Sequence, residues 1–178
     1  MGTTVPIQLD LPVSCYWVVP ASFMAGAHPG FGGEERILTA LRALRSQGIE
    51  TFVDLTEAGE CVDYEPLLAA EPPPGARVPE YRRIAVPDMS VPSRERMSAV
   101  LDLIDDTRSR GRALYLHCLG GLGRTGTVVG CHLVRNGLTG EEALERIDAL
   151  RVDLVNAFSF SPVTDEQERF VKEWRVGS

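Results

Sequence analysis

One short stretch of the chain carries residue types that together could bind phosphate and attack it. Cys118 is followed after five residues by Arg124, and three glycines lie between them. Glycines let successive backbone N–H groups point into one concavity, which binds anions. A Cys at the rim of such a concavity is stabilised as the nucleophilic thiolate. Arg124 adds a planar guanidinium that matches two oxygens of a phosphate. These residues indicate phosphoryl transfer to cysteine.

Regular elements on both sides must position this stretch. Residues 113–116 form an apolar run typical of a buried strand, and residues 125–134 predict a helix. The helix adds its unpaired N-terminal N–H groups and the positive end of its dipole. We therefore expect a phosphate-binding loop made of Leu119, Gly120, Gly121, Leu122, Gly123 and Arg124. The alternative is a glycine-rich turn that holds a buried free Cys.

These residues also resemble a known family. His117-Cys118, five residues, then Arg124-Thr125 is similar to the HCx5R(S/T) signature of the cysteine-dependent protein tyrosine and dual-specificity phosphatases. The GGLGR run is most similar to small dual-specificity enzymes such as the cyclin-dependent-kinase-associated phosphatase. The resemblance implies a phosphomonoester hydrolase that uses a phosphocysteine intermediate and no metal or cofactor. It implies that Thr125 hydrogen-bonds the sulfur as leaving group, and that His117 supports the loop from behind.

Expulsion of an alkoxide or phenoxide from phosphate needs a proton donor. Asp88, in VPDMSVPS, follows a predicted strand and lies on a proline-flanked loop upstream of Cys118. In the family that the chain resembles, a mobile loop at this distance carries the general acid, and Asp88 is the matching residue. The alternative is an Asx-turn residue between two prolines. This second motif argues against a rhodanese-like domain, which also carries a cysteine loop.

Gln167 has two competing interpretations. It is the third helical residue after Thr164 and so completes a capping box, which requires no further function. The segment SPVTDEQ is also similar to one found in related small phosphatases, and phosphatases of the family use a Gln to place the hydrolytic water. We take capping as the default and water positioning as the alternative.

Other residues have weaker support. Cys61 could resolve an oxidised Cys118, whereas Cys131 lies about 10 Å along the helix axis beyond Arg124 and is expected in the core. The candidate rim residues are Tyr64, Arg94 and Arg96, although a solvated helix face explains the arginines equally well.

Strand-like and helix-like segments alternate along the chain. Strands are expected at 15–19, 23–25, 51–55, 82–86 and 113–116, and helices at 34–47, from Ser93 to Gly111, at 125–134, and after the caps Thr139 and Thr164, with a helical turn near Leu67. This order predicts an α/β fold with a mostly parallel central sheet flanked by helices on both faces. Ligands of such sheets bind beyond the carboxyl ends of the strands, where the phosphate-binding loop would lie.

Composition bounds the remaining properties. We expect residues 1–178 to form one domain, with 1–12 as an irregular lead-in. A net charge of −7 disfavours nucleic acid and anionic membranes as partners. The sequence shows no transmembrane run, no secretory leader and no metal-ligand spacing of Cys and His. A catalytic thiolate needs a reducing compartment, so we expect the protein in the cytoplasm. We also expect a monomer.

The substrate is less constrained. The loop carries no Lys, which weighs against a highly phosphorylated inositol headgroup. By resemblance we expect a shallow site that accepts phosphotyrosine, and phosphoserine or phosphothreonine, in a phosphorylated protein or peptide. The alternatives are a phosphatase of a lipid or small phosphate ester, and a non-catalytic phospho-binding module.

Overall fold

A five-stranded sheet forms the centre of the molecule in the computed structural model, which describes residues 11–30, 32–70 and 78–175. Its strands lie in the order β1-β2-β5-β3-β4. The β1–β2 pair is antiparallel, and the other three pairs are parallel. The bounds are β1 Cys15–Val19, β2 Phe23–Gly26, β3 Ile49–Asp54, β4 Glu80–Arg83 and β5 Ala113–His117. The expected fold class is therefore confirmed, while most of the lead-in 1–12 lies outside the described residues.

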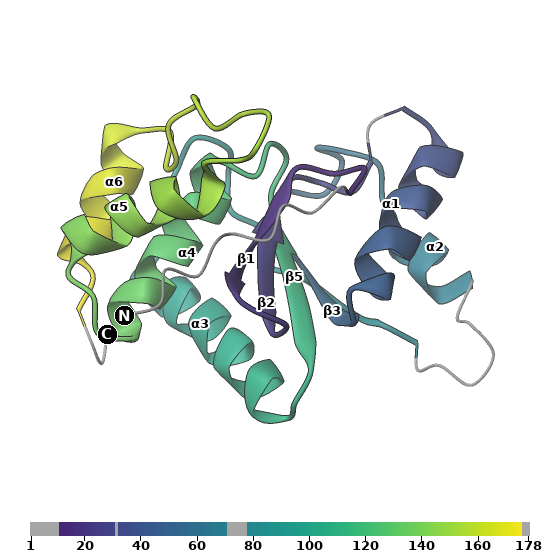
Figure 1. Cartoon of the computed structure of the whole chain (residues 1–178), viewed down its shortest axis with the longest axis horizontal. Helices are drawn as coiled ribbons and strands as arrows, with labels where there is room; N and C mark the ends of the chain where they lie inside the picture. Colours follow the sequence, from purple (N-terminus) through teal and green to yellow (C-terminus); the bar gives the residue numbers. More distant parts are fainter. Residues whose placement is uncertain (1–10, 31, 71–77, 176–178) are drawn as a thin grey trace.

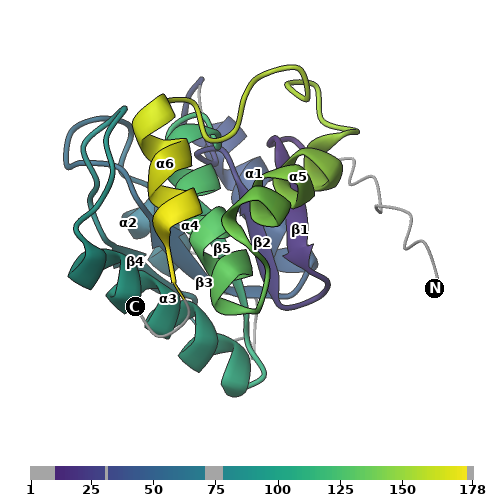
Figure 2. The same ribbon diagram turned by 90° about the vertical axis from the view of Figure 1, so that its left-hand side faces the viewer.

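Helices cover both faces of the sheet (Figure 1). α1 and α2 lie on one face, and α3 to α6 lie on the other (Figures 1 and 2). Their bounds are α1 Glu34–Ser46, α2 Glu65–Ala70, α3 Arg94–Ser109, α4 Gly123–Arg135, α5 Gly140–Arg151 and α6 Asp165–Glu173. None of these helices, all within the described ranges, is long and apolar enough to cross a membrane.

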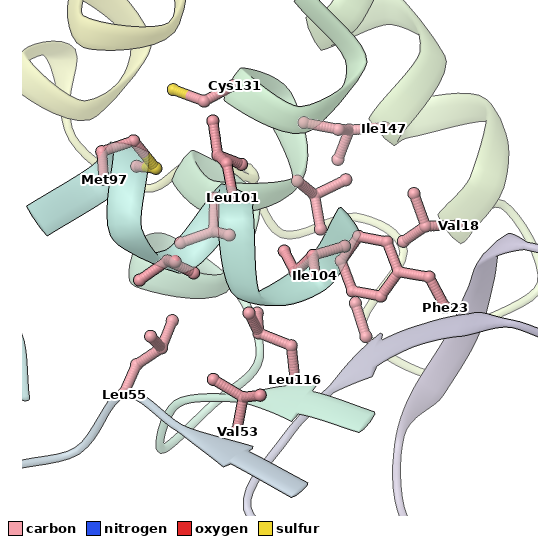
Figure 3. Packing of buried hydrophobic residues seen from close by; sticks show 14 of the residues in the cluster. Val18, Phe23, Val53, Leu55, Met97, Leu101, Ile104, Leu116, Cys131 and Ile147 are labelled. Carbon is pink, nitrogen blue, oxygen red and sulfur yellow. The ribbon is translucent and has the colours of Figure 1, made fainter. Parts of the chain in front are cut away.

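Alternate side chains of each strand point into two separate cores, as the period of a strand requires. In β2, Phe23 and Ala25 face the larger core, whereas Met24 faces the smaller one. The larger core packs apolar residues of α3 to α6 on the sheet, among them Leu101, Cys131 and Ile147 (Figure 3). Because α4 is buried on most sides, it is the central helix of this layer.

Several element bounds differ from expectation by one to three residues, and two of these differences bear on the site. β4 ends at Arg83 rather than at residue 86. Its pairing with the β3 end nevertheless continues, since the N–H groups of Ile84 and Val86 donate to Asp54 and Leu55. α4 begins at Gly123, two residues earlier than expected, so Arg124 lies in its first turn.

Candidate active site

The phosphate-binding loop joins β5 to α4 at the carboxyl edge of the sheet (Figure 1). Gly121 has φ 72°, and a Cβ there would lie 2.4 Å from the carbonyl carbon of Gly26. Only glycine fits this close approach without backbone displacement. The neighbouring Leu119 carbonyl accepts from the His28 N–H at 3.0 Å. The loop is thus fixed against the segment that follows β2.

The guanidinium of Arg124 is buried and held in one orientation. Its Nη1 donates to Glu60 Oε2 at 2.8 Å and to the Val86 carbonyl at 3.0 Å, and Nη2 donates to Glu60 Oε1 at 2.5 Å. The pKa of Glu60 lies below its ordinary value, chiefly because of the Arg124 hydrogen bonds. Within the described part of the chain, Arg124 Nε has no hydrogen-bond partner. The guanidinium therefore keeps one N–H group that can donate to an anion.

Asp88 lies at the same guanidinium. Its Oδ1 is 3.0 Å from Arg124 Nη2, and 61% of its side chain is exposed. The loop that carries it turns at Met89, whose φ of 56° is unusual for a residue with a side chain. The fold thus brings a carboxyl group that precedes Cys118 by 30 positions to the edge of the phosphate-binding loop.

Gln167 is a buried link between three segments of the site. It completes the expected capping box, because its Oε1 accepts from the Thr164 N–H at 3.2 Å while Thr164 Oγ1 accepts from the Gln167 N–H. Its Nε2 donates to the Ser90 carbonyl of the Asp88 loop at 3.0 Å. A Cβ at Gly123 would lie 2.9 Å from Oε1, so the side chain also touches the phosphate-binding loop.

His117 is buried directly before the phosphate-binding loop and contacts its first residue. Its Nδ1 lies 3.1 Å from the Cys118 carbonyl, which can only accept, so Nδ1 carries the proton. Burial lowers the pKa of His117 to about 4, so the ring is neutral near pH 7. Nε2 must then accept from the Tyr64 hydroxyl, which lies 2.6 Å away. Tyr64 is fully buried and is not the rim residue that we expected.

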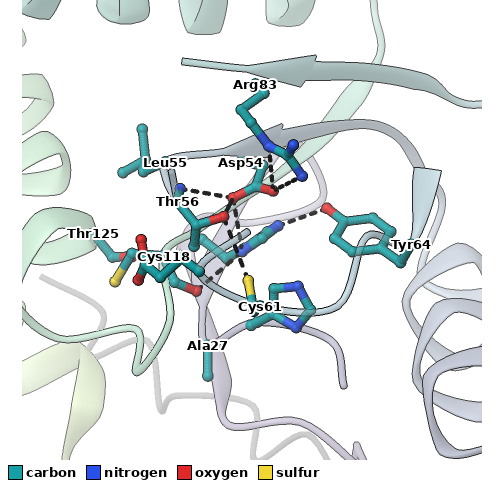
Figure 4. A network of polar contacts seen from close by, with 12 residues as sticks. Ala27, Asp54, Leu55, Thr56, Cys61, Tyr64, Arg83, Cys118 and Thr125 are labelled. Atoms are coloured by element: carbon teal, nitrogen blue, oxygen red, sulfur yellow. Dashed lines mark hydrogen bonds and ion pairs between the residues drawn. The ribbon is translucent and has the colours of Figure 1, made fainter. Parts of the chain in front are cut away.

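A buried carboxylate organises the end of β3 next to His117 (Figure 4). Asp54 accepts from the Thr56 N–H and hydroxyl and from the Tyr81 hydroxyl, and it pairs with Arg83. Burial alone would raise the pKa of Asp54, but His117 and the Thr56 and Tyr81 hydrogen bonds together hold it below its ordinary value. This network fixes Leu55, whose backbone meets both His117 and Val86.

The other candidate residues have different surroundings. Thr125 lies beside Cys118, and its hydroxyl donates to the Gly26 carbonyl at 3.4 Å, so a bond to sulfur stays a prediction (Figure 4). Cys61 donates to Thr56, and burial raises the pKa of its thiol, which disfavours the thiolate that a resolving cysteine needs. The core position of Cys131 is confirmed.

The arginines proposed for the rim are engaged elsewhere. Arg94 lies over the rings of Phe170 and Trp174, and Arg96 donates to the Ala85 carbonyl. Among the described residues, no group of three His, Cys, Asp or Glu side chains could hold a metal ion.

Sequence reasoning missed Glu60, Asp54 and Arg83. Glu60 reaches Arg124 across 64 positions from an irregular segment, and no local pattern marks it. A weak indication of Asp54 was present in the sequence, because a carboxylate at the end of a buried apolar strand needs hydrogen-bond or charged partners there.

A family model described as a polymorphic toxin system DSP-PTPase phosphatase (Tc-R-P) matches residues 29–138, which is more than half of the chain. The chain belongs to this phosphatase family. By its description the family is one of dual-specificity and tyrosine phosphatases. The matched region includes Glu60, Asp88, Cys118 and Arg124.

The chain is also similar to two curated proteins, one of which is named as a tyrosine phosphatase. It is 30% identical over 166 residues to the putative tyrosine phosphatase 067L of Invertebrate iridescent virus 3, with 86% of this chain and 65% of the viral protein covered. It is 32% identical over 91 residues to the uncharacterized protein MJECL20 of Methanocaldococcus jannaschii, with 51% and 56% covered. The chain thus covers less than two thirds of the length of either relative.

Solved structures share the fold. Tk-PTP in its active form superposes with a TM-score of 0.68 at 25% identity, covering 90% of this chain and 95% of that one. Kinase associated phosphatase with its catalytic-site cysteine replaced by serine gives 0.70 at 19% identity, with 96% and 94% covered. TpbA of P. aeruginosa, in complex with pTyr, gives 0.68 at 16% identity, with 97% and 92% covered.

Proposed function

We propose that this phosphatase hydrolyses phosphomonoesters on protein side chains through a phosphocysteine intermediate at Cys118. The observation that carries the proposal is the meeting of Arg124 and Asp88, 3.0 Å apart, beside the loop that begins at Cys118. A phosphate binder and a proton donor are thereby brought to one nucleophile. A non-catalytic binding module would need neither the nucleophile nor the acid.

In the first step the Cys118 thiolate attacks phosphorus, and an S–P bond forms as the ester P–O bond breaks. Arg124 and the amides of residues 119–123 bind the equatorial oxygens, on which charge spreads. Asp88, in its protonated form, gives its proton to the departing oxygen. Glu60 keeps the guanidinium in the orientation that this geometry requires, because it accepts two of its N–H bonds.

In the second step water attacks phosphorus and the S–P bond breaks, which regenerates the thiolate. The Asp88 carboxylate takes the proton of the attacking water, so the acid returns to its starting form. We expect the Thr125 hydroxyl to turn from the Gly26 carbonyl to the departing sulfur and to stabilise it, as the family resemblance implies. Phosphate leaves as the second product.

Replacement of the nucleophile tests the mechanism. Cys118→Ser should abolish turnover while phosphate binding persists, since the hydroxyl is a far weaker nucleophile but leaves the loop amides in place. Activity should persist in EDTA. Turnover above a few per cent in the serine variant, or an EDTA loss that Mg²⁺ restores, would refute the mechanism.

A panel of phosphopeptides, phosphoinositides and nucleotides tests the substrate class. We expect the highest kcat/KM on phosphotyrosine peptides. A clear preference for a lipid or nucleotide would replace the protein substrate with that ester and leave the phosphocysteine chemistry intact.

A further inference from the structure

Exposed apolar side chains gather on two segments that border the active site. In the parts of the chain that the structure describes, eight large hydrophobic side chains are exposed, and six of them lie at 89 or within 152–163. Five of these six form what we name the apolar rim. The apolar rim consists of Met89, Val155, Phe158, Phe160 and Val163.

The apolar rim is tied to the catalytic machinery by hydrogen bonds. Ser161, next to Phe160, donates to the Leu122 carbonyl of the phosphate-binding loop at 2.9 Å. Val163 donates its N–H to Gln167 Oε1, and Gln167 Nε2 donates to Ser90, the residue after Met89. A residue bound at Cys118 therefore has the rim segments as its immediate neighbours.

A buried cation fixes the shape of the segment that presents the two rings. Arg151, at the end of α5, is 1% exposed, and it donates to the carbonyls of Ser159 at 2.9 Å and Asn156 at 3.0 Å. Figure 2 shows this segment between α5 and α6 standing away from both helices. Phe158 and Phe160 are 101% and 80% exposed although their backbone is anchored on both sides. Exposed aromatic side chains on an anchored backbone indicate a binding surface rather than a chain end left loose.

The charges around the apolar rim indicate the chemistry of its partner. The charged side chains of 152–166 are all acidic, and each of them, Asp153, Asp165 and Glu166, is exposed. An anionic lipid surface would be repelled by these carboxylates. A peptide that combines apolar and basic residues would be attracted by them and would cover the rings.

We infer that the apolar rim binds the segment of a phosphoprotein substrate that flanks the phosphorylated residue, and that it selects apolar and basic flanks. The inference rests on the proposed function, because it takes the phosphorylated residue to enter the Cys118 loop. It adds a preference for the residues that flank the phosphorylated one, which the chemistry at Cys118 does not define.

The test compares two phosphotyrosine peptides with an aryl phosphate that has no flanks. One peptide carries Leu, Phe and Lys beside the phosphotyrosine, and the other carries Ser, Gly and Glu. The first should be the better substrate, and Phe158→Ser combined with Phe160→Ser should lower its kcat/KM relative to the aryl phosphate roughly tenfold. Val78→Ser is the matched control, because Val78 is 59% exposed but lies just before β4. It is thus at the amino end of a parallel strand, whereas the phosphate-binding loop follows the carboxyl end of β5.

Peptide affinity, measured by fluorescence anisotropy in a Cys118→Ser background, separates this inference from the proposed function. If the two peptides differ in affinity but the wild type does not hydrolyse the aryl phosphate, the proposed chemistry alone is refuted. If the aryl phosphate is hydrolysed but the two peptides do not differ, the inference alone is refuted. An unchanged ratio in the double variant overturns the inference. The inference is also overturned if the double variant keeps its peptide selectivity but loses binding to vesicles or loses a dimer that the wild type forms. The apolar rim would then serve a lipid surface or a second copy of the chain.

Discussion

Replacement of Gln167 by Glu should slow the step in which Asp88 gives its proton to the leaving group, without unfolding the protein. The native side chain is fully buried, accepts from Val163 and Thr164, and donates to the Ser90 carbonyl at 3.0 Å. A glutamate can keep both accepted bonds and so preserves the cap. It has no proton for Ser90 when ionised, so two acceptors then face each other.

The size of the effect follows from that one bond. The lost hydrogen bond is worth about 1 kcal/mol, and a buried acceptor left without a donor costs about 1–3 kcal/mol more. Residues 87–89 of the Asp88 loop are exposed, so the loop can move away from α6 and relieve most of this cost. A displacement near 1 Å at a reacting group costs on the order of a hundredfold in rate. We expect kcat/KM to fall roughly 10- to 100-fold on an ester with a poor leaving group, and much less on an activated aryl phosphate.

Thr164→Ala is the matched control. It removes the hydroxyl that caps α6 at 3.2 Å but leaves the Gln167–Ser90 bond in place. It should lower the free energy of unfolding by about 1 kcal/mol, with no change in leaving-group dependence.

Two results would refute this reasoning. One is a stable Gln167→Glu protein whose leaving-group dependence matches that of the wild type. The other is a burst of leaving group before a slow steady state, which would mean that Gln167 acts on the water of the second step.

The remaining predictions concern the proton donor Asp88, the Arg124 partner Glu60 and the buried His117. Asp88→Asn should lower kcat/KM for poor leaving groups on the order of a hundredfold, and an equal fall for activated aryl esters would assign the acid elsewhere. Glu60→Ala should lower the free energy of unfolding by about 2 kcal/mol, measured in urea, because the buried guanidinium loses two charge-assisted hydrogen bonds and keeps Asp88 and the Val86 carbonyl as partners; an unchanged midpoint would contradict this. The pKa of His117 falls from 6.5 in the unfolded chain to about 4 in the native protein, so its contribution to stability is complete above pH 6.5. About 3 kcal/mol should be lost as the pH drops to 4, and a flat urea midpoint over that window would contradict the assignment.

The phosphate-binding loop could be predicted from sequence because its determinants are local. Glycines between a buried strand and a helix define the backbone, and Gly121 confirms this with a left-handed conformation against Gly26. The capping boxes at Thr139 and Thr164 are local in the same way, and both are present.

The parts that escaped prediction depend on long-range packing. Arg124 pairs with Glu60, which lies 64 positions earlier in an irregular segment before α2. Tyr64 was a candidate for the rim, but its ring packs against Phe52 of β3 and its hydroxyl reaches His117 of β5, 53 positions away. The second bond of Gln167 was hidden for the same reason, since Ser90 is 77 positions away.

The close contact of α6 with the rest of the fold sets the moment at which the site becomes complete. Gly130 and Gly140 let α6 approach α4 and α5, where an added Cβ would meet Val171 at 2.7 Å and the Lys172 backbone at 2.4 Å. Until α6 has docked, neither Ser161 nor Gln167 can hold the phosphate-binding and Asp88 loops. During synthesis the nucleophile, the arginine and the acid therefore all emerge before the element that aligns them. The hydrogen bonds that hold these two loops thus come from Ser161 and Gln167, which lie beyond residues 29–138 that the family model matches.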